Sequence, residues 1–98
     1  MVYEITSTPV FEKWLKNLKD RQTRNKVLAR VARIENGNFG DFKQLGENLF
    51  ELRFFFAGGL RIYYSIQQTK VVLLLNGGDK SSQKNNIAKA KQILDELD

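Results

Sequence analysis

The amino-acid sequence predicts an α+β fold: a short N-terminal strand, a helical hairpin, an antiparallel meander of three or four strands, and a C-terminal helix. Two observations lead to this class. Apolar residues recur with helical spacing over residues 9–35 and 82–97, and they alternate with other residues over residues 50–66, as in strands. Helices followed by strands in this order favour an antiparallel sheet with the helices on one face.

Chain length and composition limit the possible functions. The 98 residues fit one domain, taken here as residues 1–98, and 42% of them are hydrophobic. The absence of cysteine and histidine excludes disulfides, thiol catalysis and the Ser-His and Cys-His triads. The longest apolar run, Val71–Leu75, is too short to span a membrane, and the N-terminus lacks a signal-peptide pattern. We therefore expect a cytoplasmic protein without membrane attachment, and no cofactor is predicted.

The net charge of +5 is concentrated near the N-terminus, since residues 1–36 contain eight basic and four acidic residues. A basic protein of this size favours polyanionic partners, which include nucleic acid, an acidic protein or a membrane surface. A solvated helical surface would account for the same charge equally well.

The first strand and the two following helices are predicted from their boundaries. Alternation over residues 2–5 predicts the strand, and Thr8 followed by Pro9 predicts a helix start. A break near Asp20 precedes a second helix of about residues 21–35, which Asn36-Gly37 ends. The predicted buried stripes are Phe11, Trp14, Leu15 and Leu18 in the first helix, and Val27, Leu28, Val31 and Ile34 in the second.

After a turn-rich stretch over residues 36–49, the sequences "LFELRFFF" and "LRIYYSI" alternate and are joined by "AGG", which predicts a β-hairpin. A three-residue loop that pairs Phe56 with Leu60 puts both apolar sets on one face. The other face then presents Arg53, Arg61 and Tyr63 close together, uncovered by helices. This face is either an anion-binding surface or an ordinary solvated sheet face.

The segment "VVLLLNGGDKSSQ" connects a central strand, apolar on both faces, to the C-terminal helix. Gly77-Gly78 predicts a sharp turn or positive φ, and Ser81 or Ser82 is the expected cap. Free amides at the helix start would favour a phosphate with Lys80 beside it, although a plain capped turn is an equally simple interpretation. The expected buried stripe of this helix is Ile87, Ala90, Leu94 and Leu97.

If the ligand is RNA, these side chains suggest a chemistry. Arg53 and Arg61 would stabilise the phosphate, because a guanidinium is permanently charged and bidentate. Lys80 would act as base or acid, and Tyr63 would stack on a base or donate a proton. The sequence has no dense carboxylate cluster, so a metal-dependent nuclease is disfavoured and no metal site is predicted.

The stretches "NFGDFKQLGENLFELRFFFAGGLRIYYS" and "VVLLLNGGDKSSQKNNIAKAKQIL" together resemble the RelE/ParE toxin superfamily, and most closely its phage-derived addiction module killer branch, which is related to HigB toxins. The N-terminal "FEKWLKNLKDRQTRNKVLARVARIENGNFGD" is also typical of that branch, so the resemblance covers nearly the whole chain and implies a RelE-like fold.

This resemblance implies the toxin of a type II toxin–antitoxin module that cleaves mRNA without metal, normally on the ribosome. It also implies a helix-turn-helix antitoxin as partner and operator DNA bound through the toxin–antitoxin complex. The matching positions are Arg61 and Arg53 as strand arginines and Lys80 in the C-terminal catalytic region. The remaining RNA-binding candidates are Lys43, Tyr63, Ser81 and Lys84.

Two alternatives use the same scaffold. A ParE-like inhibitor of DNA gyrase would rely more on the basic early helices than on the sheet face. A non-catalytic nucleic-acid-binding module, or a degenerate toxin, would use the same cations for binding alone.

Overall fold

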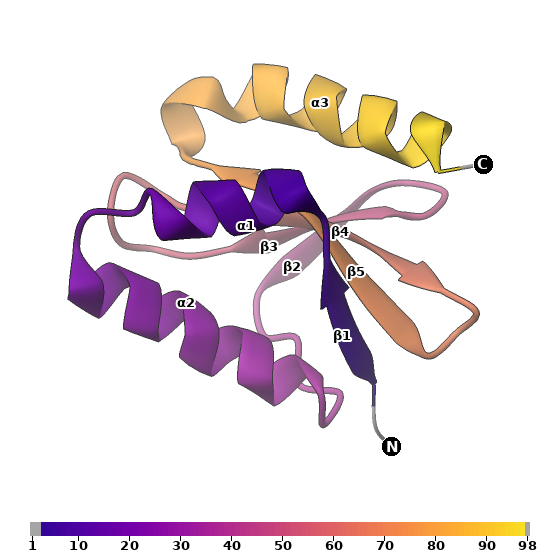
Figure 1. The fold of residues 1–98 in the computed structure, drawn as a ribbon, viewed down its shortest axis with the longest axis horizontal. Coiled ribbons are helices and arrows are strands. Elements are labelled where there is room, and N and C mark those ends of the chain that lie inside the picture. The colour runs from indigo at the N-terminus through magenta and orange to yellow at the C-terminus, as the bar shows by residue number, and fades with distance from the viewer. Residues whose placement is uncertain (1–2, 98) are drawn as a thin grey trace.

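The computed structural model describes residues 3–97, which form a five-stranded sheet covered by helices on both faces (Figure 1). Val2, part of the first predicted strand, lies outside the described residues. The elements in chain order are β1 (Glu4–Ser7), α1 (Pro9–Lys16), α2 (Arg21–Ile34), β2 (Phe42–Gly46), β3 (Leu49–Arg53), β4 (Arg61–Gln67), β5 (Val71–Gly78), a short 3₁₀ turn (Lys80–Ser82) and α3 (Gln83–Glu96). No helix within residues 3–97 is long and apolar enough to cross a membrane.

The sheet has the strand order β1-β5-β4-β3-β2, in which β1 runs parallel to β5 and the other neighbours are antiparallel. The central position predicted for the apolar strand is confirmed, because β5 lies between β1 and β4. The residues of β2 were placed in a turn-rich stretch by sequence reasoning, which did not identify them as a strand. It is an edge strand, and Phe42, Lys43 and Gln44 are all exposed, so its sequence carries no alternation of buried and exposed residues.

The predicted starts of the first two helices are confirmed. The Thr8 hydroxyl accepts a hydrogen bond from the Phe11 amide at 3.1 Å and donates one to the Leu75 carbonyl at 2.5 Å, which ties α1 to β5. Asp20 caps α2 by accepting from the Gln22 amide. Leu28, however, was expected on the buried face and is 49% exposed, while Thr23 is buried in the first turn of α2.

The prediction that all helices lie on one sheet face is wrong, because α3 covers the face opposite α1 and α2 (Figure 1). Several strand residues that face α3 are apolar, among them Leu49, Tyr63 and Leu75, so that face also requires cover. The core against α1 and α2 contains Phe11, Val27, Ile34, Leu52, Phe54, Leu60, Ile62, Tyr64, Val72 and Leu74. The core against α3 contains Leu49, Tyr63, Leu75, Ala90 and Ile93, so Ile93 is buried in α3 and the predicted Leu97 is half exposed.

The register predicted for the β3–β4 hairpin is wrong by two residues. Arg53 pairs with Arg61 and Leu52 with Ile62, and the loop closes where the Phe54 amide donates to the Leu60 carbonyl. Three consecutive loop residues, Ala57–Gly59, have positive φ, so the turn is wider than a three-residue loop. A shift of two leaves every side chain on its predicted face, and it sets Arg53 directly opposite Arg61.

Gly77 and Gly78 belong to β5 and have no positive φ, which corrects the predicted turn. They are needed because neighbouring side chains approach closely. A Cβ on Gly77 would lie 2.6 Å from the Trp14 ring, and one on Gly78 would lie 2.1 Å from Asn86 Nδ2. The register of β4 and β5 shifts just before this point, between Tyr63 and Tyr64.

Candidate functional site

A solvent-open cleft of about 330 Å³ lies where the β3–β4 hairpin loop meets the 3₁₀ turn after β5. Arg53 on β3, Arg61 on β4 and Lys80 in the turn all line it, so the structure brings the three predicted catalytic residues together. The Lys80 amide donates to the Gly58 carbonyl at 3.2 Å and holds the loop against the turn. The remaining lining residues are Phe54, Phe55 and Gly59. This cleft is named the arginine cleft below.

Arg61 is the most firmly held cation of the arginine cleft, and its side chain is only 14% exposed. Its Nη1 donates to the Gly59 carbonyl at 2.7 Å, and its Nε lies 3.4 Å from Glu51 Oε2. Gly59 has φ +76°, and an added Cβ there would come within 3.1 Å of Arg61 Nη1. Loop and guanidinium therefore fix each other in position.

Glu51 is a buried residue that supports this arrangement. Its side chain is 1% exposed, and its Oε2 accepts a hydrogen bond from Gln83 Nε2 at 2.7 Å. Glu51 thus connects β3 to the first residue of α3 and places a negative charge beside the Arg61 guanidinium. Sequence reasoning assigned no role to Glu51. The available signal was its position two residues before Arg53, on the same sheet face.

Arg53 is held by a second set of contacts. Its Nη2 lies 3.2 Å from Asp41 Oδ1, and its side chain is 38% exposed. Arg30 of α2 donates to the carbonyls of Arg53, Phe39 and Asp41, and its guanidinium lies 4.5 Å from the Phe54 ring centroid. Burial lowers the pKa of Arg30. Sequence reasoning assigned no role to Arg30, which fixes the backbone on both sides of the Arg53–Asp41 ion pair.

Tyr63 has no exposed surface, because α3 covers it. Burial and the nearby carboxylate of Glu51 raise the pKa of Tyr63, so the phenol stays protonated. The expectation that this ring stacks on an RNA base therefore does not fit the structure. It followed from placing all helices on the opposite sheet face.

In the 3₁₀ turn that precedes α3, two amides are occupied by a side chain and are not free for a phosphate. The Asp79 carboxylate accepts from the amides of Ser81 and Ser82 at 3.0 and 3.2 Å and from the Ser81 hydroxyl at 2.6 Å. Asp79 thus caps the 3₁₀ turn, while Ser82 stands at the predicted N-cap position of α3 but makes no side-chain cap hydrogen bond. The hydrogen bond from Ser81 lowers the pKa of Asp79. Ser81 and Lys84 are exposed nearby, Lys43 is exposed on β2, and none of the three lines the arginine cleft.

Phe55 is a lining residue of the arginine cleft to which sequence reasoning assigned no role. It is 86% exposed, the highest value among the exposed large hydrophobic residues within residues 3–97. Its exposed ring offers a surface on which a planar group can stack.

The chemistry available in the arginine cleft follows from its lining. Three cationic side chains converge there and no carboxylate lines it, so the cleft suits an anion such as a phosphodiester. The two guanidiniums are fixed donors that can stabilise charge developing on phosphate oxygens, and the Lys80 amine can exchange a proton. Across residues 3–97, no group of three or more acidic side chains is arranged to hold a metal ion.

Solved structures of similar fold are toxins. The chain matches the free state of a double arginine-to-alanine mutant of the E. coli toxin RelE, with a TM-score of 0.74, 17% identity and coverage of 95% of this chain and 99% of that one. It also matches the RelBE2 toxin–antitoxin complex of Mycobacterium tuberculosis, with a TM-score of 0.68, 16% identity and coverage of 82% and 100%. These likenesses show the RelE fold.

Two sequence comparisons show the family. An uncharacterized protein of Haemophilus influenzae is 41% identical over 97 residues, which cover 99% of this chain and 98% of that protein. The model of the family described as "Phage derived protein Gp49-like (DUF891)" matches residues 13–97. The chain therefore belongs to the Gp49-like family of phage-derived proteins and has the fold of RelE toxins.

Proposed function

We propose that this protein is the toxin of a type II toxin–antitoxin module and inhibits translation by cleaving mRNA on the ribosome. The observation that carries the proposal is the convergence of Arg53, Arg61 and Lys80 on one solvent-open cleft. The RelE fold supports it, because the matched solved structures are named as RelE toxins.

The proposed reaction is a transesterification within the RNA strand. The ribose 2′-oxygen attacks the adjacent phosphorus, the bond to the 5′-oxygen breaks, and the products are a 2′,3′-cyclic phosphate and a 5′-hydroxyl end. The 2′-hydroxyl loses a proton and the departing 5′-oxygen gains one. Arg61, and Arg53 beside it, stabilise the extra negative charge on the phosphate oxygens. Proton transfer falls to Lys80, because a guanidinium stays protonated.

The proposed partner is an antitoxin with a helix-turn-helix domain, which neutralises the toxin and carries the pair to operator DNA. Two of the matched structures are toxin–antitoxin complexes, and in another E. coli RelE is bound to an antitoxin peptide. The proposed location is the cytoplasm, where the ribosome and mRNA are found.

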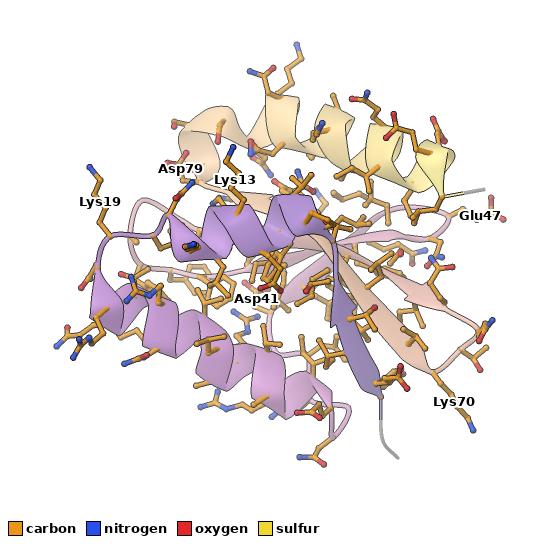
Figure 2. The ribbon with its side chains drawn as sticks, in the orientation of Figure 1. Lys13, Lys19, Asp41, Glu47, Lys70 and Asp79 are labelled. Carbon is orange, nitrogen blue, oxygen red and sulfur yellow. The ribbon has the colours of Figure 1, made fainter. Side chains whose placement is uncertain are left out.

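The test is to add the purified protein to a translating extract and map mRNA ends by primer extension. Cleaved mRNA is expected with the native protein. Arg61→Ala is expected to lower the cleavage rate by about 100-fold or more, the scale of losing one oriented donor to a developing oxyanion. Lys70→Ala is the control, because it also removes one positive charge but lies just before β5 and outside the arginine cleft. Figure 2 shows the Lys70 side chain.

Intact mRNA in an extract whose translation is arrested would contradict the nuclease. A supercoiling assay with purified gyrase would then test the ParE-like alternative. Binding of RNA without cleavage would identify a non-catalytic module.

A further inference from the structure

A second cleft, of about 370 Å³, lies between α2 and the β3–β4 hairpin loop. One wall carries the cations Lys26, Arg30 and Arg33, and the other carries three consecutive phenylalanines, Phe54–Phe56. The three basic residues lie on α2, in the basic N-terminal third of the chain. This cleft is named the α2 cleft below.

The arginine cleft and the α2 cleft share a wall. Phe54 and Phe55 line both of them. Phe54 is buried, while Phe55 is 86% exposed and belongs to the lining of both clefts. A flexible chain that leaves one cleft at Phe55 enters the other directly.

The cations of the α2 cleft are available to a ligand. The two ion pairs within residues 3–97 involve Arg53 and Arg61, so no carboxylate pairs with Lys26 or Arg33. Lys26 Nζ lies 4.8 Å from the Phe56 ring centroid, which keeps its charge beside the aromatic wall. Arg30 is fixed by backbone carbonyls, so it adds its positive charge to this wall while Lys26 and Arg33 remain free to bind.

Alternating cations and exposed aromatic rings form the surface that binds single-stranded nucleic acid, since cations bind phosphates and rings stack on bases irrespective of sequence. An acidic protein segment would find the same cations, but an isolated, almost fully exposed ring between two cationic clefts suits a splayed base better than an aliphatic side chain.

We propose that RNA bound in the arginine cleft stacks one base on Phe55 and continues into the α2 cleft, where Lys26 and Arg33 bind the phosphates of the flanking nucleotides. This inference rests on the proposed function, because it takes RNA as the ligand. It makes Phe55 a residue that positions the strand, and it extends the binding site beyond the reacting phosphate.

The experiment measures binding of single-stranded 2′-O-methyl RNA by fluorescence anisotropy. This analogue lacks the attacking hydroxyl, so affinity is measured without cleavage. The intact protein is titrated into a labelled dinucleotide and a labelled decanucleotide. Phe55→Leu is expected to weaken binding of the longer RNA by about 5- to 100-fold, the range for losing one base stack, and Phe55→Trp is expected to restore it. The exposure of Phe55 leaves folding of both variants intact.

Lys26→Ala and Arg33→Ala are expected to weaken only the longer RNA, and each is expected to reduce the slope of log Kobs against log salt by about 0.7. Lys70, which Figure 2 labels, lies at the far end of β5. Lys70→Ala is therefore the matched control and should change the affinity for neither the dinucleotide nor the decanucleotide.

Equal binding of the longer RNA by native protein and Phe55→Leu would overturn the inference. So would variants that lose affinity for the antitoxin while keeping that for RNA, because the surface would then belong to the protein partner. If Phe55→Leu, Lys26→Ala and Arg33→Ala all cleave mRNA and bind the decanucleotide with native affinity, this inference fails and the proposed function stands. If the native protein binds the decanucleotide more tightly than the dinucleotide but does not cleave mRNA, the proposed function fails and the extended binding surface stands.

Discussion

At the residue scale, Glu51 and Arg61 illustrate how a buried charge is retained for positioning. Each alone would be costly to bury, and together with Gln83 they hold a guanidinium at the edge of a solvent-open cleft. The Arg61 guanidinium donates one hydrogen bond from Nη1 to the Gly59 carbonyl. This bond fixes the direction in which its remaining N–H groups point.

Removing the Glu51 carboxylate should therefore destabilise the fold. Glu51→Ala leaves the Arg61 guanidinium beside an empty buried site, and we expect a loss of about 3 kcal/mol in the free energy of unfolding, measured by urea denaturation. Glu47→Ala, in the exposed β2–β3 turn (Figure 2), is the control and should stay within about 0.5 kcal/mol of the native value. Equal stability of the two variants would show that Glu51 does not hold Arg61.

The shape of the Arg61 side chain matters as well as its charge. Arg61→Lys keeps the positive charge but cannot contact Gly59 and Glu51 while also presenting a donor pair to a phosphate. We expect cleavage by Arg61→Lys to fall nearly as far as by Arg61→Ala, while affinity for RNA is retained more fully. A native kcat for Arg61→Lys would show that only the positive charge of Arg61 matters, and not the geometry of its guanidinium.

The Asp79 cap gives a pH dependence with a defined sign. The hydrogen bond from Ser81 depresses the pKa of Asp79 below its ordinary 3.8 in the folded state. Its contribution to stability is therefore fully present above pH 3.8 and is lost as the pH falls through the folded-state pKa.

Asp79→Asn should consequently show a shallower loss of stability on acidification below pH 3.8, measured by thermal unfolding at a series of pH values. Some acid dependence should remain, because the hydrogen bond from Thr23 lowers the pKa of Asp20 in the same direction. Identical acid limbs for native protein and variant would contradict the role of the cap.

At the scale of elements, the end of β5 depends on two glycines that admit side chains from opposite helices. Gly77→Ala would place a methyl group 2.6 Å from the Trp14 ring of α1, and a bulky indole cannot retreat without disturbing the core. We expect a destabilisation of about 1–3 kcal/mol in urea denaturation. Gly46→Ala is the matched control, because its nearest neighbour would be 3.9 Å away. Equal stability of both variants would show that α1 can shift away.

The elements also mark how far the sequence alone could lead. Caps such as Thr8 and Asp20 act within a few residues, so they were readable from the sequence, as was the alternation in β3 and β4. The strand β2 was not, because its exposed edge position removes the pattern. The face covered by α3 was also missed, since a five-residue apolar run shows that both faces are buried without showing which helix lies on which.

The residues of the candidate site also fall into those that could be predicted from the sequence and those that could not. Arg53, Arg61 and Lys80 were found because a resemblance and a sheet face both pointed to them, and the register error of two residues preserved that face. Glu51, Arg30 and Phe55 were not assigned roles. Their importance comes from contacts between segments distant in the chain, such as Arg30 with the carbonyl of Arg53, which no local pattern records.

At the scale of the whole molecule, the cations determine how RNA binding responds to salt. The 2′-O-methyl dinucleotide has one phosphodiester, so its binding in the arginine cleft should show a slope of log Kobs against log salt of roughly −0.7. Anisotropy titrations of the 2′-O-methyl dinucleotide at several salt concentrations measure this slope. A slope near zero would mean that the arginine cleft does not contact phosphate.

The parallel pairing of β1 with β5 also affects how the protein is made. Since β5 begins at Val71, β1 has no partner in the sheet until the ribosome has translated the chain as far as β5. Contacts of such long sequence separation, including the bond from Thr8 to Leu75, form late and slow the folding of small proteins. Lys80 is added later still. A nascent or prematurely terminated chain that ends before Val71 therefore lacks a closed sheet, and one that ends before Lys80 lacks a complete arginine cleft.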